Sequence, residues 1–518
     1  MKKGFTLIEL LAVILILGII ALIAIPTVNN ILKEARRGAF SSTLTNIEKA
    51  IENECNLSQI KNQNINNVYT ISNGIISPNV DIKGNLPDGT IYANKNCEIA
   101  YTLFNNNLTG NKEIGEDPII DDKKSNGIYK ENILNGTDPV LSNNLIPVRI
   151  EKDGTVFKAD LNSKWYSYAE KKWANAVILT DTGKVEDNGM ILEDSIESYF
   201  VWIPRYKYKL FDMGNYNSVI EGKPTTSYAK TIEIVFENKN TNVSAGTKVG
   251  DYHSHPAFQA FGTNGIWIGK FEASGDIDNI RIKPNKQSLR SLNVKTIFEL
   301  SYNYKRNNDS HMMKSTEWGA VALLSNSKYG ISTQININNN SNRVTGYSAV
   351  AGTNQTSFPG TYGLDSKITE PYNTKTGYLA STTGNIYGIY DMSGGTHEYL
   401  ASYIDNMFYN SGFDASIISN YNQKYFDIYP SNSSVNSYNN RILGDATGEM
   451  GPFYVYDEGS LRNHNAWYQN NSDFLHAAAP WVTRGGDYTY GVLAGQFHFG
   501  SNTGEGATHL GFRVALAN

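Results

Sequence analysis

The sequence contains few cysteines and few charged residues. Only two of its 518 residues are cysteines, and none follows Cys97. A metal site built on soft thiolate ligands is therefore excluded from the rest of the chain. Charged residues make up 18% of the sequence, below the ~25% that is typical of soluble domains. The formal net charge is −5 and no block of basic residues occurs, which argues against a nucleic-acid partner.

The short motifs of common enzyme sites are also missing. The sequence has no phosphate-binding loop, no nucleophile elbow and no HExxH segment. His253 and His255 are two residues apart, so both can lie on one face of a strand as metal ligands. No third ligand for a metal can be named. We therefore expect no metal and no cofactor, with a structural calcium ion as the alternative. His397 stands beside Glu398, which suggests acid–base chemistry, but the segment around them favours a structural role.

A long apolar run is present at the start of the chain. Residues 5–25 contain a single charge, Glu9, and about 20 residues rising ~1.5 Å each span the hydrocarbon core of a bilayer. A signal peptide or signal anchor is the alternative, but no small-residue cleavage pattern follows the run. A carboxylate inside a spanning helix costs at least ~2.5 kcal/mol, so Glu9 is a functional candidate.

The segment KKGFTLIELL at residues 2–11 resembles the class III signal of type IV prepilins and pseudopilins. In that family a prepilin peptidase cuts after the glycine and methylates the new N-terminal residue. The resemblance implies cleavage between Gly4 and Phe5, methylation of the Phe5 amine, and pairing of Glu9 with the N-terminal amine of a neighbouring subunit. Pairing with a cation makes a buried carboxylate tolerable. We expect a leader at 1–4 and a transmembrane and assembly helix at 5–55.

Residues 56–144 are predicted to form a small pilin-like β head. Short apolar clusters alternate there with turn sequences such as Asn73-Gly74. In type IV pilins, a sheet of this kind packs against the second half of the helix. For an exported chain, the even pair Cys55 and Cys97 suggests one disulfide closing a loop of about 40 residues, which stabilises by ~3–4 kcal/mol. Two free thiols are the alternative.

Residues 145–194 are predicted to form a separate β module or linker. The segment IPVRIEKDGTVFKAD has alternating apolar residues on both sides of Asp153-Gly154, a two-residue pair that favours a hairpin turn. No chemistry is apparent in this stretch.

Residues 195–518 are predicted to form one large domain, because characteristic segments recur along it in a fixed order. They include STEW (315–318), GNIYGIYDMSGGTHEY (384–399), RGGD (484–487) and GFR (511–513). Together they resemble the formylglycine-generating (sulfatase-modifying) family, whose fold is a variant of the C-type lectin fold. Gly395 replaces the family's asparagine and Tyr399 its tryptophan. The family's oxidase chemistry uses a pair of cysteines to hold copper, and these are absent here, so we expect no enzyme of that kind.

Residues 484–516 also resemble the C-terminal variable region of proteins that are diversified by retroelements and use the same fold to vary their ligand contacts. A surface loop of a purely structural domain is the alternative. The resemblance implies the following candidate ligand-binding residues: Asp487, Tyr488, Tyr490, Gln496, His498, Ser501, Asn502, Thr503, Glu505, Thr508 and His509.

These features predict an α+β protein: a long hydrophobic pilin helix, a small β head and a large C-type lectin-like domain. The hypothesis is a minor type IV pilin that displays a non-catalytic binding module for adhesion. Its expected partners are a prepilin peptidase, other pilin subunits, the cytoplasmic membrane before assembly and an unknown protein or glycan ligand at the cell surface. One rival is a pseudopilin of a type II secretion or DNA-uptake machine. Another is a surface-anchored enzyme on the formylglycine-generating fold.

Overall fold

The computed structural model describes residues 46–104 with short gaps, and residues 135–517 apart from 211–230, 351–368, 432–441, 451–452, 455–463 and a few isolated positions. The predictions for Gly4, Phe5 and Glu9 therefore lie outside the described residues. Within the described ranges, no helix is both long enough and apolar enough to cross a membrane. The chain divides into two compact units, Met1–Leu134 and Asn135–Asn518.

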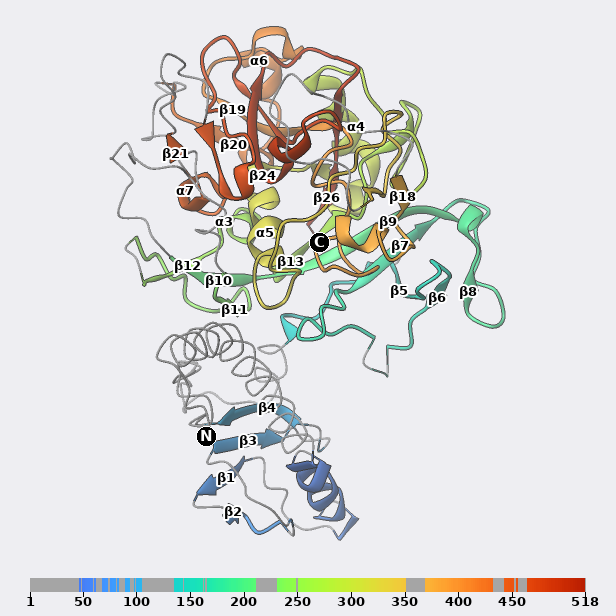
Figure 1. Ribbon diagram of the computed structural model, residues 1–518, viewed down its shortest axis with the longest axis vertical. Helices are drawn as coiled ribbons and strands as arrows, with labels where there is room; N and C mark the ends of the chain where they lie inside the picture. The colour runs from blue at the N-terminus through green and yellow to red at the C-terminus, as the bar shows by residue number, and fades with distance from the viewer. Residues whose placement is uncertain are drawn as a thin grey trace, which may run out of the picture. The chain divides into compact units, whose positions relative to one another are not determined.

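The described part of the first unit combines a helix with a small sheet (Figure 1). Helical residues lie between positions 46 and 60. The antiparallel sheet has the order β2-β1-β3-β4, with β1 at Val68–Ser72, β2 at Ile75–Ser77, β3 at Gly89–Ala93 and β4 at Ile99–Phe104. Ile47 and Ile51, one helical turn apart, pack in a small core with Tyr69, Ile71 and Ile91. The sheet lies where the sequence predicted one.

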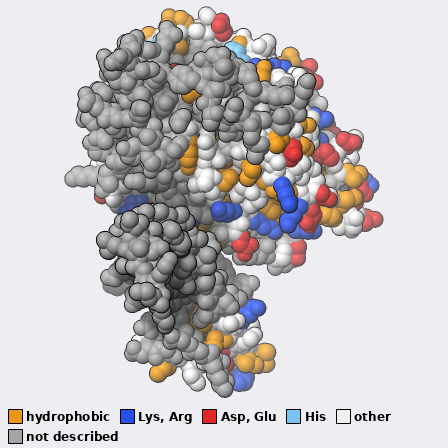
Figure 2. Space-filling model, viewed as in Figure 1, with side chains coloured by type: hydrophobic (Ala, Val, Ile, Leu, Met, Phe, Trp, Pro, Cys, Tyr) orange, Lys and Arg blue, Asp and Glu red, His pale blue; other side chains and the backbone are white. Residues whose placement is uncertain are grey.

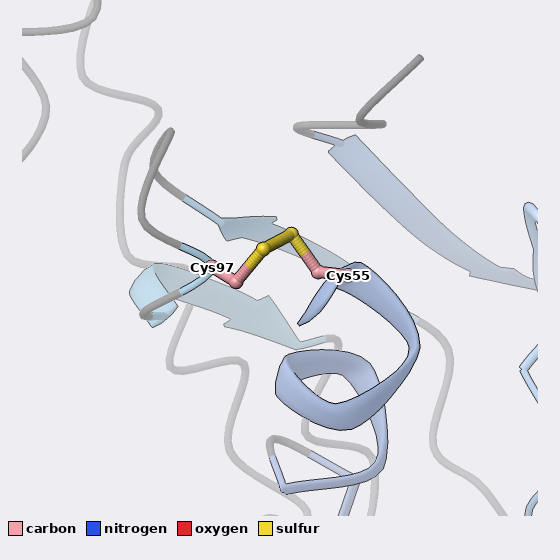
Figure 3. The surroundings of a disulfide bond; sticks show 2 residues. All are labelled: Cys55 and Cys97. Atoms are coloured by element: carbon pink, nitrogen blue, oxygen red, sulfur yellow. A yellow bond between two sulfur atoms is a disulfide. The ribbon is translucent and has the colours of Figure 1, made fainter. Parts of the chain in front are cut away.

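Cys55 and Cys97 are joined by a disulfide bond, as predicted (Figure 3). Cys55 is on the helix, and Cys97 lies in the connection between β3 and β4. Both side chains are buried. The bond joins residues 42 positions apart and ties the helix to the sheet.

The second unit contains an eight-stranded antiparallel sheet. Its order is β16-β26-β13-β9-β7-β5-β6-β8 (Figure 1). The strands are β16 (His311–Met312), β26 (Val514–Leu516), β13 (Gly265–Gly269), β9 (Ile196–Pro204), β7 (Asn175–Leu179), β5 (Ile146–Ile150), β6 (Val156–Lys158) and β8 (Met190–Ile191). All nine residues of β9 are buried, so this central strand is covered on both faces.

The predicted hairpin around Asp153-Gly154 is present. Strands β5 and β6 pair in register from Ile150 opposite Val156, and Gly154 takes a positive φ of 92°, which glycine adopts readily. The prediction of a separate module at 145–194 needs correction, however. Strand β7 pairs with β9, so residues 145–194 supply one half of the same sheet and belong to the second unit.

A second sheet follows in the C-terminal half of this unit. Strand β19 (His397–Ile404) runs parallel to β20 (Asp427–Tyr429) and β25 (Leu510–Phe512) and antiparallel to β23 (Trp481–Gly485), which pairs with β24 (Gly495–Asn502). The apolar residues of both sheets belong to one continuous core that extends from Leu145 to Ala517.

Helix α5 (Ser315–Ser325) is the most deeply buried helix among the described residues. The sequence predicted a helix with one buried face, but all eleven residues are buried. Glu317 accepts a hydrogen bond from the backbone N–H of Lys314 (2.9 Å) at the start of the helix. A Cβ at Gly319 would lie 1.8 Å from the carbonyl oxygen of Gly444, so glycine permits this close approach.

The remaining elements are short, except α4 (Val294–Tyr304), whose first turn is capped by the side chain of Asn293. They are β10 (Tyr206–Lys209), β11 (Ile234–Phe236), β12 (Tyr252–Ser254), β14 (Ser274–Asp276), β15 (Asn279–Arg281), β17 (Tyr347–Ala349), β18 (Thr369–Pro371), β21 (Phe453–Tyr454), β22 (His464–Asn465), α3 (Pro256–Gln259), α6 (Ala415–Ile418) and α7 (Thr447–Met450). On the face in Figure 2, the described surface carries acidic and basic side chains close to one another.

Candidate functional site

A buried ion pair joins the motif segments of the second unit. Arg513 binds Glu398 through two hydrogen bonds, from Nε to Oε2 (3.0 Å) and from Nη2 to Oε1 (2.6 Å), and both side chains are fully buried. The guanidinium also donates to the carbonyl oxygens of Gly269 (2.8 Å) and Tyr390 (2.9 Å). Burial lowers the pKa of Arg513, but Glu398, Asp391 and Glu272 together outweigh burial and raise this pKa. Three segments far apart in the sequence, around Gly269, residues 384–399 and Arg513, therefore meet at one guanidinium.

Two further carboxyl groups lie near this pair. Asp391 has a positive φ of 62° and accepts hydrogen bonds from the N–H of Gly346 and from Asn338. Burial, followed by the charges of Asp391 and Glu398, raises the pKa of Glu272 well above its ordinary value. These groups are enclosed in the core, and their bonds position the loop that precedes β19.

His397 and Glu398 are adjacent in the sequence but have different surroundings. Glu398 binds Arg513 in the core, whereas His397 contacts the rings of Tyr490, His498 and His509. Successive residues of a strand point to opposite faces, and both residues lie on β19. The structure thus separates the two groups that the sequence suggested as an acid–base pair.

The histidine side of β19 forms part of a cluster that includes several predicted ligand-binding residues. Ring centroids of His397 lie 4.6 Å from Tyr490, 5.2 Å from His498 and 5.8 Å from His509. His397 and His498 are buried, while Tyr490 and His509 are partly exposed. The cluster therefore has a buried floor and a rim that reaches solvent.

Arg343 continues the cluster on the neighbouring surface. Its Nε donates to Oδ2 of Asp487 (2.9 Å), and its Nη2 lies 2.9 Å from the same oxygen in an ion pair. Its guanidinium lies 4.7 Å from the ring centroid of Tyr488, whose N–H donates to the carbonyl oxygen of Gly395 (3.2 Å). We call these residues together the Arg343–His397 cluster: Arg343, His397, Asp487, Tyr488, Tyr490, His498 and His509.

The two buried histidines of the cluster are neutral at physiological pH. Burial lowers the pKa of His498 to about 4. Burial, then His498, His509 and Arg343, lowers the pKa of His397 well below its ordinary value. His498 Nδ1 donates to the carbonyl oxygen of Leu493 (3.0 Å), so its Nε2 is an acceptor. Among the described residues, neither His498 Nε2 nor His397 Nδ1 has a hydrogen-bond partner.

The other predicted ligand-binding residues are distributed elsewhere. Gln496 is buried and accepts a hydrogen bond from Ser325 (3.0 Å) on α5. At the opposite end of β24, Asn502 accepts a hydrogen bond from Tyr399 (2.8 Å), and Glu505 accepts one from Asn410 (3.4 Å). Ser501, Thr503 and Thr508 are partly or fully exposed. The structure therefore brings together only the predicted residues Asp487, Tyr488, Tyr490, His498 and His509.

His253, on β12, and His255, which directly follows this strand, both contact the ring of Tyr208. His255 is buried, and its Nδ1 caps α3 by accepting a hydrogen bond from the N–H of Ala257 (3.3 Å). His253 Nδ1 bonds to the carbonyl oxygen of Gly246 (3.0 Å). In the described parts of the chain, no three residues of the types His, Cys, Asp and Glu are arranged to hold a metal ion.

Arg343 and the nearby Arg290 were not predicted from the sequence. Arg290 is partly exposed and donates through Nη1 to the carbonyl oxygen of Thr508 (2.7 Å). Both arginines are more than 140 residues before Asp487, in segments without a motif. No pattern in a single sequence connects them to the C-terminal stretch.

One part of the chain matches a known protein family. Residues 1–25 match the prokaryotic N-terminal methylation motif. Among curated proteins, none matches the chain. The match supports a type IV pilin-like prepilin signal, and such a signal implies processing by a prepilin peptidase and assembly with other pilin subunits.

Proposed function

We propose that the protein is a minor type IV pilin that displays a non-catalytic recognition domain at the cell surface. The observation that carries the proposal is the methylation motif at residues 1–25 in the same chain as a separate compact unit at 135–518. The motif supports a pilin-like or pseudopilin role. The large second unit favours surface display, because a compact head is enough for a subunit that only builds a filament.

The recognition surface is the Arg343–His397 cluster. Its rim combines aromatic rings, a guanidinium and an imidazole, residue types that are common in binding surfaces. The bonds of Arg513 and Glu398 hold β19 and β26 in place beneath it, so the recognition residues lie on a rigid scaffold. The motif segments that meet at Arg513 support a C-type lectin-like domain, and the missing cysteines of the formylglycine-generating family support a binding role rather than oxidase chemistry.

The size of the chain favours a minor subunit. Everything after residue 55 would project from the filament, and a domain of this size in every subunit would crowd its neighbours. The inferred pairing of Glu9 with a neighbouring amine favours a position within the filament over the first position. The N-terminal helix then contacts other pilins, and the second unit contacts the surface ligand.

Attachment of cells that carry the filaments tests this function. A Tyr488→Ala/His509→Ala double variant removes two partly exposed rim side chains, and we expect it to reduce attachment to glycan-coated and protein-coated surfaces. Arg149→Ala, at an exposed site on β5, is the matched control and should attach normally. Unchanged attachment by the double variant, at equal surface abundance, would argue against recognition through this cluster.

A further inference from the structure

We propose that Arg290 and Arg343 together bind the carboxylate of an acidic sugar, such as a hexuronic acid residue of a surface polysaccharide. This inference rests on the proposed recognition function and specifies its ligand class. It follows from two neighbouring arginines, of which Arg343 is paired with Asp487 and Arg290 is held by carbonyl oxygens alone.

Arg290 has donors that the protein leaves available. Its Nε donates to the carbonyl oxygen of Ser288 (3.3 Å), and its Nη1 to that of Thr508 (2.7 Å). These bonds fix the side chain but do not neutralise it. Over the described parts of the chain, no carboxylate forms an ion pair with Arg290, and its Nη2 has no hydrogen-bond partner. A guanidinium that is held by carbonyl groups and open to solvent is suited to an anionic ligand.

Arg343 lies beside Arg290 because the backbones of their two segments are hydrogen-bonded to each other. The carbonyl oxygen of Arg343 accepts a hydrogen bond from the N–H of Ser288 (3.0 Å), two residues before Arg290. Nε and Nη2 of Arg343 both contact Asp487. The third nitrogen, Nη1, has no partner among the described residues. Burial, followed by the charge of Arg343, lowers the pKa of Arg290, in agreement with their proximity.

Only one of the two guanidinium groups on this surface is paired with a carboxylate. Arg343 binds Asp487, whereas Arg290 is held by carbonyl oxygens. The buried His397 and His498 are neutral. The carboxylate of a ligand could therefore accept bonds from the remaining donors of Arg290 and Arg343, and a carboxylate accepts bonds from arginine with favourable geometry.

The neighbouring side chains favour a sugar acid over an acidic peptide. Tyr488, Thr489 and Thr508 offer hydroxyl groups that are at least partly exposed, which suit a hydroxylated ligand. A hexuronic acid carries one carboxylate among several hydroxyls. A polyacidic peptide would bring further carboxylates close to Asp487, where like charges repel.

The test uses sheared filaments that contain the full chain and three immobilised probes: oligogalacturonate, the same oligosaccharide after reduction of its carboxylates to alcohols, and a polyglutamate peptide. We expect binding to oligogalacturonate, and at least about tenfold weaker binding to the reduced form, because the bonds lost involve charged groups. Arg290→Ala should weaken oligogalacturonate binding by a similar factor, while Arg290→Lys should retain part of it. The control Arg149→Ala removes an exposed guanidinium elsewhere and should bind like the unmodified chain.

Equal binding to the intact and reduced oligosaccharides would overturn the proposal, as would preferential binding to polyglutamate or full binding by Arg290→Ala. Filaments that attach to surfaces through the cluster but do not bind oligogalacturonate would refute the ligand class. They would not contradict the recognition function. A chain that is absent from sheared filaments would instead refute the proposed function itself.

Discussion

At the scale of single residues, the Arg513–Glu398 pair dominates the interior of the second unit. Removing one partner of a buried ion pair leaves the other charge without compensation, which costs about 3–5 kcal/mol. We therefore expect Glu398→Gln to lower the free energy of unfolding of the second unit by about that amount in urea titrations. The control is Glu299→Gln, which breaks the partly exposed i,i+4 pair with Lys295 and should cost at most ~0.5 kcal/mol. Equal effects of the two variants would contradict the assigned role of Glu398.

His498 makes the stability of the second unit depend on pH. Its folded-state pKa of about 4 lies below the ordinary value near 6.5, so the unfolded chain binds a proton first as the pH falls. The contribution is fully present above pH ~6.5 and is lost progressively toward pH ~4. Between pH 7 and pH 4.5 we expect the unmodified chain to lose about 2 kcal/mol more than His498→Asn, measured by urea unfolding. A parallel pH dependence of both proteins would show that His498 does not titrate as inferred.

The sequence identified some residues of the candidate site and missed others for physical reasons. Asp487, Tyr488, Tyr490, His498 and His509 come from one stretch near the C-terminus, so a motif resemblance could indicate them together. Arg290 and Arg343 reach the cluster through the fold, which brings distant segments together without a local signal. His397 and Glu398 show the converse, because strand alternation separates residues that are neighbours in the sequence.

At the scale of elements, the pairing of β7 with β9 shows that residues 145–194 belong to the second unit. Asn175 on β7 accepts a hydrogen bond from the buried Lys270 (2.8 Å), and Trp173 donates to the carbonyl oxygen of Tyr329 (2.8 Å). A fragment of residues 195–518 would expose one edge of β9, all of whose residues are buried. We expect that fragment to be insoluble or unfolded by circular dichroism, and the fragment 135–518 to unfold cooperatively. Equal stability of the two fragments would indicate that residues 145–194 form a separate module.

The disulfide is the corresponding feature of the first unit. A bond between residues 42 positions apart stabilises a fold by about 4 kcal/mol, chiefly by restricting the unfolded chain. We expect a Cys55→Ser/Cys97→Ser variant to lower the melting temperature of the first unit in calorimetry. The transition of the second unit should not move, because Asn135–Asn518 contains no cysteine. A shift of both transitions would indicate that the two units unfold together.

The sequence predicts the β5–β6 hairpin but not the order of the strands in the sheets. Alternating apolar residues around Asp153-Gly154 are local, and the hairpin was predicted correctly. The position of β26 beside β13 was not, because Val514–Leu516 joins a strand more than 240 residues earlier. The sequence alone does not distinguish between apolar strands of similar length. Packing in the common core determines which of them pair.

At the scale of the whole molecule, the central claim is that one chain combines a processed pilin N-terminus with a surface recognition domain. Mass spectrometry of the protein in sheared surface filaments tests this claim most directly. We expect the filament fraction to contain a chain that begins at an N-methylated Phe5 and retains residues 135–518. A chain that begins at Met1 and occurs only in membranes would contradict it.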